Sequence, residues 1–200
     1  MVAAVAGGGR ALSLKATRRT VLAGLAIVPM LAPVHAARAE ISFPDWYTLA
    51  NAASQNKIED VAALLRRGDN PNFLDGAGRS PLSYAAALGN TAIIKLLLDY
   101  YARIDYRDKF GATPLHWAAE NGRNEAVREL LAAKAPVDAT NREGVTPLML
   151  AAGNNRADAV RLLLKAGADP KKQDFTGRDA MSWAKGQPSA LRVLETAHPS

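Results

Sequence analysis

The chain has 200 residues, no cysteine and a formal net charge of +6, so disulfides and cysteine-ligated metal sites are excluded. Hydrophobic residues make up 48% and aromatic residues 6%, a composition that can bury a core and favours helices over a β-sandwich. Five of the 25 basic residues and none of the 19 acidic ones lie in residues 1–39. The remainder is nearly neutral, so we expect it not to bind nucleic acid.

Residues 1–39 have the three zones of an export signal. A basic, acid-free stretch ends in Thr17-Arg18-Arg19, an apolar run extends from Val21 to about Val34, and Ala37-Arg38-Ala39 follows. Signal peptidase accepts small residues one and three places before the cut, so we expect cleavage after Ala39. The apolar run is broken by prolines and is shorter than the ~20 residues of a membrane span. We therefore expect no stable membrane anchor after cleavage.

The adjacent Arg18 and Arg19, followed by an apolar pair, resemble the twin-arginine export motif. The long basic region, the mild alanine- and glycine-rich core and Arg38 near the cut favour this interpretation. The alternatives are a general secretory signal with a chance arginine pair and a mitochondrial transit peptide, which is also arginine-rich and acid-poor. The twin-arginine interpretation predicts a protein of the periplasm.

The rest of the chain, residues 40–200, repeats with a period of 33 residues. Four glycines stand 33 residues apart, and each follows an Asp or Asn by three residues. The glycines are Gly78, Gly111, Gly144 and Gly177, and the Asp or Asn residues are Asp75, Asp108, Asn141 and Asp174. A degenerate first copy starts at Asp45. The repeats predicted from this register are 45–77, 78–110, 111–143, 144–176 and 177–200.

Each copy predicts two helices. Thr113-Pro114 and its counterparts can start the first helix, because a hydroxyl caps free backbone N–H groups and proline is tolerated in the first turn. An Ala-Ala pair in this helix allows close approach of neighbouring helices. The second helix has apolar residues at helical spacing: Ile93, Ile94, Leu97 and Leu98. The Asp or Asn residues before the glycines can bond the turn backbone that follows them.

The ends of the second helices differ between copies. Gly68 and Gly167 can end them in the left-handed conformation. Tyr101 and Lys134 stand at the same repeat position, where a side chain costs about 1–2 kcal/mol. The second and third repeats are therefore expected either to end these helices differently or to carry local strain.

Thr113-Pro114-Leu115-His116-Trp117-Ala118, in a period of 33, resembles the ankyrin repeat. The resemblance covers about residues 41 to 200. It implies an all-α repeat solenoid of about five repeats, each a helix–turn–helix with a β-hairpin-like loop, with the terminal repeats acting as caps. It also implies that His116 ties neighbouring repeats together by hydrogen bonds.

The sequence offers no catalytic or metal site. His116 and His198 are the two histidines after residue 39, too few for a Ser-His-Asp set or a metal site. The turn Asp169–Asp174 lacks the alternating acids of a calcium loop. We expect no enzymatic activity and no cofactor. One repeat position carries large side chains that we interpret as packing: Tyr84, Trp117, Leu150 and Trp183.

The resemblance implies that a partner binds the concave face, formed by the hairpin tips and the exposed side of the first helices. Phe110 and Phe175 are the leading candidates at the tips, because aromatic residues and arginines are the usual anchors of interfaces. The alternative is that each ring packs on the neighbouring hairpin. The other candidate contacts are Arg79, Arg107, Lys109, Arg142, Glu120 and Asn121.

The sequence therefore predicts an exported, monomeric module that binds another protein in the periplasm. The alternative is an accessory or protective factor for an exported redox or metal enzyme, because twin-arginine transport carries folded and often cofactor-bearing cargo.

Overall fold

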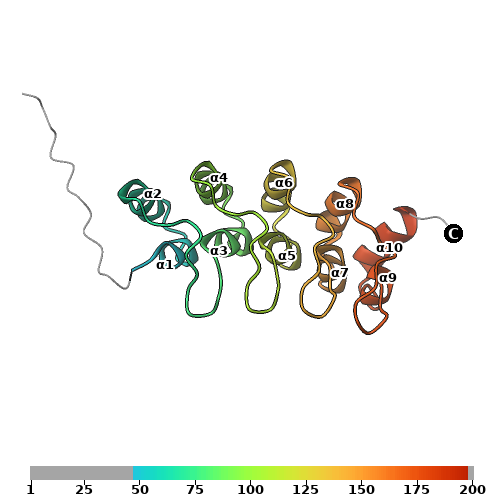
Figure 1. Ribbon diagram of the computed structural model, residues 1–200. Coiled ribbons are helices and arrows are strands. Elements are labelled where there is room, and N and C mark those ends of the chain that lie inside the picture. Colours follow the sequence, from blue (N-terminus) through green and yellow to red (C-terminus); the bar gives the residue numbers. More distant parts are fainter. Residues whose placement is uncertain (1–46, 198–200) are drawn as a thin grey trace, which may run out of the picture. The chain divides into compact units, whose positions relative to one another are not determined.

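The computed structural model describes residues 47–197, which form ten helices and no strand. Figure 1 shows the first helix of each repeat in one row, the second helices α2, α4, α6 and α8 in another, and the connecting loops projecting beside the first row. The expected signal, its cleavage site after Ala39 and Asp45 lie outside the described residues. This arrangement confirms the all-α repeat solenoid that the resemblance implies.

The ten helices form five consecutive pairs. They are α1 (Leu49–Ser54) with α2 (Ile58–Arg67), α3 (Pro81–Leu88) with α4 (Thr91–Asp99), α5 (Pro114–Glu120) with α6 (Asn124–Ala132), α7 (Pro147–Gly153) with α8 (Ala157–Lys165), and α9 (Ala180–Trp183) with α10 (Pro188–Ala197). First helices of adjoining repeats pack on one another, as α3 does on α5 and α5 on α7.

The first helices start where the sequence predicts. Proline is the first helical residue of α3, α5 and α7. The hydroxyl oxygens of Ser80 and Thr146 accept the backbone N–H groups of Ser83 and Met149. Each hydroxyl thereby satisfies a donor that the helix itself leaves unpaired.

The core lies between the two helix rows and between repeats. Ile93, Ile94 and Leu97 are fully buried, and Leu98 is half-buried. The Ala-Ala pairs of the first helices are also fully buried, and their small side chains let these helices approach closely. The pairs are Ala52-Ala53, Ala85-Ala86, Ala118-Ala119 and Ala151-Ala152.

The second helices of four repeats end in the same backbone conformation. Gly68 and Gly167 have φ of 98° and 92°, and Tyr101 and Lys134 have φ of 63° and 67°. The backbone N–H of Tyr101 bonds the Leu98 carbonyl just as that of Gly68 bonds Leu65. Tyr101 and Lys134 therefore carry the local strain of the left-handed region, and the helix ends are not altered to avoid it.

His116 links α5 to the next repeat. Its Nδ1 accepts the backbone N–H of Thr113 at 3.1 Å, so Nε2 carries the proton and donates to the Val145 carbonyl at 3.0 Å. This bond confirms the tie between repeats that the resemblance implies. Burial lowers the pKa of His116 to about 4, so the ring is neutral at pH 7 and both nitrogens keep their roles.

We predict that stability falls as the pH is lowered from about 6.5 to about 4. The unfolded chain binds a proton on His116 more readily than the folded chain, so the stabilisation is complete above the unfolded pKa and is lost as pH falls toward the folded one. The loss should be roughly 3 kcal/mol. Urea unfolding across this range measures it.

The matched control is His116→Gln, in which the part of this slope that is due to His116 should be absent. Asp75 and Asp174 have pKa values below the ordinary one, so their stabilisation begins to fall below about pH 5 and does so equally in the two proteins. An equal slope in the two proteins would show that His116 is not its source.

Candidate functional site

Four hairpins precede the first helices α3, α5, α7 and α9, and each is held by one side-chain oxygen. The Oδ1 of the Asp or Asn residue accepts the backbone N–H groups two and four residues later, at 2.8 to 3.0 Å. This confirms the predicted bonding of the turn backbone. The four residues are Asp75, Asp108, Asn141 and Asp174.

Neighbouring hairpins are joined edge to edge. The backbone N–H of Arg142 donates to the Phe110 carbonyl at 2.9 Å, and that of Phe175 donates to the Glu143 carbonyl at 3.0 Å. The Arg107 guanidinium donates to the carbonyls of Gly111 in its own hairpin and Thr140 in the next. Arg107, a candidate partner contact, is thus engaged in joining hairpins.

The second oxygen of each turn aspartate binds a ring on the following first helix. Asp108 Oδ2 accepts the indole N–H of Trp117 at 3.0 Å, and Asp174 Oδ2 accepts that of Trp183 at 3.0 Å. Asp75 Oδ2 accepts the Tyr84 hydroxyl at 2.6 Å. The sequence interpretation of these rings as packing did not include this hydrogen bond, which fixes each ring against its own hairpin.

At the hairpin before α7, both members of the aspartate–ring pair are replaced. Leu150 occupies the ring position and has no donor, and Asn141 occupies the aspartate position. A buried carboxylate oxygen without a donor is costly, and the amide avoids that cost. In the intact pairs, burial alone would raise the pKa of Asp75, but the bonds from Tyr84 and the turn backbone hold it below its ordinary value.

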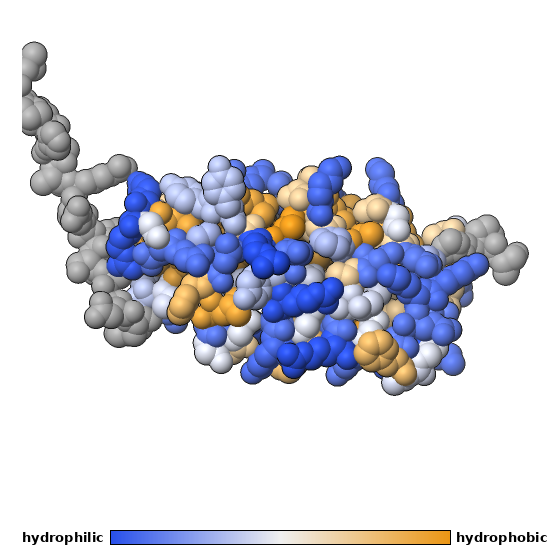
Figure 2. All heavy atoms as spheres, in the orientation of Figure 1, coloured by the Kyte–Doolittle hydropathy of each residue, from blue (hydrophilic) through white to orange (hydrophobic). Residues whose placement is uncertain are grey.

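The face built from these hairpins and rings is called the hairpin face below. Besides the turn residues Asp75, Asp108 and Asp174, its charged tip residues are Arg79, Arg107, Lys109, Arg142, Glu143 and Arg178, five basic and one acidic. In Figure 2 the lower edge, where Figure 1 places the hairpins, is largely hydrophilic and is interrupted by separate hydrophobic patches.

The two candidate phenylalanines differ in their surroundings. Phe110 is 53% exposed, and the Lys109 ammonium lies 5.2 Å from its ring centroid. Phe175 is 78% exposed, yet its Cδ1 lies 2.7 Å from where a Cβ on Gly144 would be. The Phe175 ring therefore covers the glycine of the preceding hairpin, an arrangement that any side chain at residue 144 would disturb.

The candidates at the end of α5, Glu120 and the following Asn121, already form hydrogen bonds within the protein. The Asn121 side-chain amide donates to the Trp117 carbonyl at 2.8 Å, and the Glu120 backbone carbonyl accepts from Arg156 Nε at 3.2 Å. Both residues are half-buried. Arg142 and Lys109 are exposed at the tips, so the tips offer more accessible charge than the end of α5.

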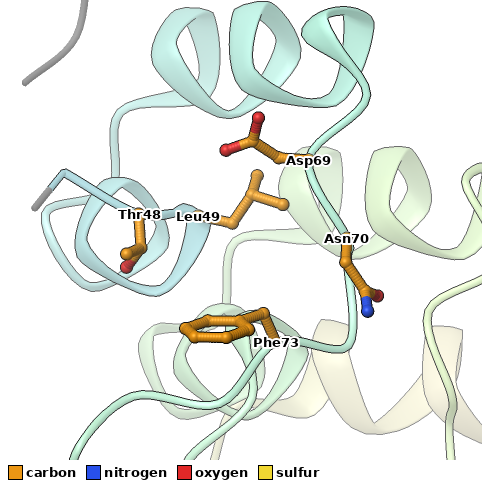
Figure 3. A pocket seen from close by; sticks show the side chains of 5 residues that line it. All are labelled: Thr48, Leu49, Asp69, Asn70 and Phe73. Atoms are coloured by element: carbon orange, nitrogen blue, oxygen red, sulfur yellow. The ribbon is translucent and has the colours of Figure 1, made fainter. Parts of the chain in front are cut away.

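A pocket lies away from the hairpin tips. It is lined by Thr48, Leu49, Asp69, Asn70 and Phe73, which come from the start of α1 and the loop after α2 (Figure 3). Phe73 is 61% exposed, and the sequence analysis did not single it out because it considered only tips and first helices. The same repeat position holds Tyr106, Ala139 and Lys172 in the later repeats, so alignment alone would have shown only that an aromatic residue recurs there once.

Within residues 47–197, no three His, Asp or Glu side chains are placed to hold a metal ion together. No helix in that same part of the chain is long and apolar enough to span a membrane.

Five helix pairs joined by hairpins define a repeat protein built from helix–turn–helix units. A family model for ankyrin repeats in three copies matches residues 49–141, 102–174 and 124–198, so the chain belongs to the ankyrin repeat family. The family's members are generally protein–protein interaction modules rather than enzymes. Over 65 residues the chain is 32% identical to FPV223 of fowlpox virus (strain NVSL), which is named as an ankyrin repeat protein. That match covers 32% of this chain and 46% of the viral protein.

We predict that Trp117 and Asp108 are energetically coupled. Trp117→Leu leaves a buried carboxylate oxygen without its donor, and Asp108→Asn can turn an amide N–H toward the indole N–H. The double variant, which copies Leu150 and Asn141, leaves neither group unpaired. Denaturant unfolding of the four proteins should give a coupling free energy of about 1–2 kcal/mol.

The control for this cycle combines Trp117→Leu with Asp174→Asn, two repeats away, where the effects should add. Additive effects for Trp117 with Asp108 would contradict the coupling.

Proposed function

We propose that this protein binds a partner protein through the hairpin face, with Phe110 at its centre. The observation that carries the proposal is the exposed Phe110 ring among basic side chains, on a hairpin between the second and third of five helix pairs. Aromatic residues surrounded by polar side chains are frequent energetic anchors of interfaces. The implied partner surface is apolar with an acidic rim.

We also propose that the protein is exported by the twin-arginine route and acts in the periplasm. This part rests on the sequence of residues 1–39 alone, with its arginine pair, apolar run and small residues before the cut. Because this route carries folded proteins, the partner can be an exported redox or metal enzyme that the repeats escort or protect.

For Phe110→Ala we predict weaker partner binding with a nearly unchanged thermal midpoint. Truncating a central anchor typically costs about 2 kcal/mol, or roughly 30-fold in affinity. The partner is first isolated by affinity capture from periplasmic extract, and binding and thermal unfolding are then measured on the same variant.

Phe73→Ala is the matched control, because Phe73 is similarly exposed but lies off the hairpin face. It should leave partner affinity unchanged. If Phe110 only packs on the next hairpin, Phe110→Ala will instead lower the thermal midpoint and leave binding per folded molecule intact.

We expect replacement of Arg18 and Arg19 by lysine to retain uncleaved protein in the cytoplasm, since the route depends on the arginine pair. Cell fractionation and the mass of the mature N-terminus measure this, with Arg10→Lys as a control outside the motif. Unchanged export of the double variant would rule out the twin-arginine route but not export.

A further inference from the structure

We propose that Arg79, held by Trp117, receives a carboxylate from an acidic segment of the partner protein. This inference rests on the hairpin-face function and specifies the chemistry of the partner. It singles out one arginine from several basic residues on the face by what its guanidinium contacts.

Arg79 is stacked but not ion-paired. Its Cζ lies 3.7 Å from the ring centroid of Trp117, in the next repeat, and 5.5 Å from that of Tyr84 in its own repeat. Among the described residues no carboxylate forms an ion pair with it. The Asp75 carboxylate accepts the Tyr84 hydroxyl and two turn N–H groups; it forms no ion pair with Arg79, although the Arg79 charge helps to lower the Asp75 pKa.

Stacking engages the face of the guanidinium, while its N–H groups lie at its edge and can donate to another group. The planar fork of arginine matches the two oxygens of a carboxylate, and a fork that is already held loses less freedom on binding. Trp117 is itself fixed, because Asp108 accepts its indole N–H. The Arg79 side chain also hydrogen-bonds with the Tyr84 side chain, so Arg79 is a prearranged cation whose remaining N–H groups form no ion pair within the described residues.

Arg178 stands at the same repeat position as Arg79 but is ion-paired. Its Nη2 lies 2.9 Å from Asp174 Oδ2, and its Nε donates to the same oxygen at 3.1 Å. It stacks 4.5 Å from the ring of its own repeat, Trp183. The Arg178 charge is thus neutralised within its own hairpin, which makes this residue an internal control for Arg79.

The positions of two further cations favour a segment over a single terminal carboxylate. Lys109 and Arg142 follow Arg79 on the next two hairpins, are exposed, and form no ion pair with any described residue. One terminal carboxylate can reach only one of the three, whereas acidic side chains along one extended segment can reach all of them. We therefore assign the occupant as an acidic peptide segment.

The test measures binding of short fluorescein-labelled peptides to the mature protein by anisotropy. Three peptides share one backbone sequence: Glu at alternate positions with an amidated end, Gln at those positions with an amidated end, and the Gln peptide with a free carboxylate. The Glu peptide should bind about tenfold tighter or more than either Gln peptide. Its affinity should fall as salt is raised.

The variants distinguish a specific contribution of Arg79 to peptide binding from a general effect of positive charge. Arg79→Gln should weaken Glu-peptide binding about tenfold, while Arg178→Gln and Arg66→Gln, on the exposed surface of α2, should not. Arg79→Lys keeps the charge but loses the planar fork, and should restore only part of the affinity. Thermal unfolding of each variant shows whether loss of stacking has altered the fold.

Equal binding of Glu and Gln peptides, equal binding of the free-carboxylate Gln peptide, or equal effects of Arg79→Gln and Arg66→Gln would overturn the assignment. Measuring how the two variants bind the natural partner distinguishes the two proposals. If its binding is weakened by Phe110→Ala but not by Arg79→Gln, the hairpin-face function stands and the acidic-segment inference falls. If neither variant weakens it, the hairpin-face function itself fails.

Discussion

One side-chain oxygen in each hairpin accepts two backbone N–H groups, and the hairpin face depends on this bond pair. A tight turn with those donors unpaired would lose the free energy of both bonds. The same carboxylate uses its other oxygen to hold a ring on the first helix, as Asp108 holds Trp117. A single residue type thereby sets both the position of the tip and the orientation of the aromatic surface behind it.

Repetition of this unit does not make the face uniform. Where Asn141 and Leu150 replace the Asp–ring pair, the surface loses a hydrogen-bonded ring. Arginines at equivalent positions also differ, since Arg178 is neutralised by Asp174 while Arg79 is stacked on Trp117. Differences in neighbouring side chains thus give each repeat of the scaffold its own charged and apolar surface groups.

The features set within one repeat were predictable from the sequence. The helix starts, the alanine pairs and the turn bonds follow from local residue types in a fixed period. Among contacts with the adjoining repeat, the family resemblance supplied the bond of His116, and packing of Phe175 on a neighbouring hairpin was one of two alternatives. The bond from Arg107 to the Thr140 carbonyl was not predictable, because it requires knowing which group lies opposite. The strain at Tyr101 also needed coordinates, since its sequence fits either helix ending.

Contacts between repeats also restrict how the array can change its length. His116 reaches a carbonyl 29 residues ahead, and Arg123 reaches the Ala87 carbonyl 36 residues back, past Gly89, where a Cβ would lie 3.0 Å from the Arg123 side chain. An insertion inside a helix that is not a full period would separate the partners that lie on either side of it. Gain of a whole 33-residue unit keeps the helix and hairpin period of the units around it, so duplication of complete repeats disturbs these contacts least.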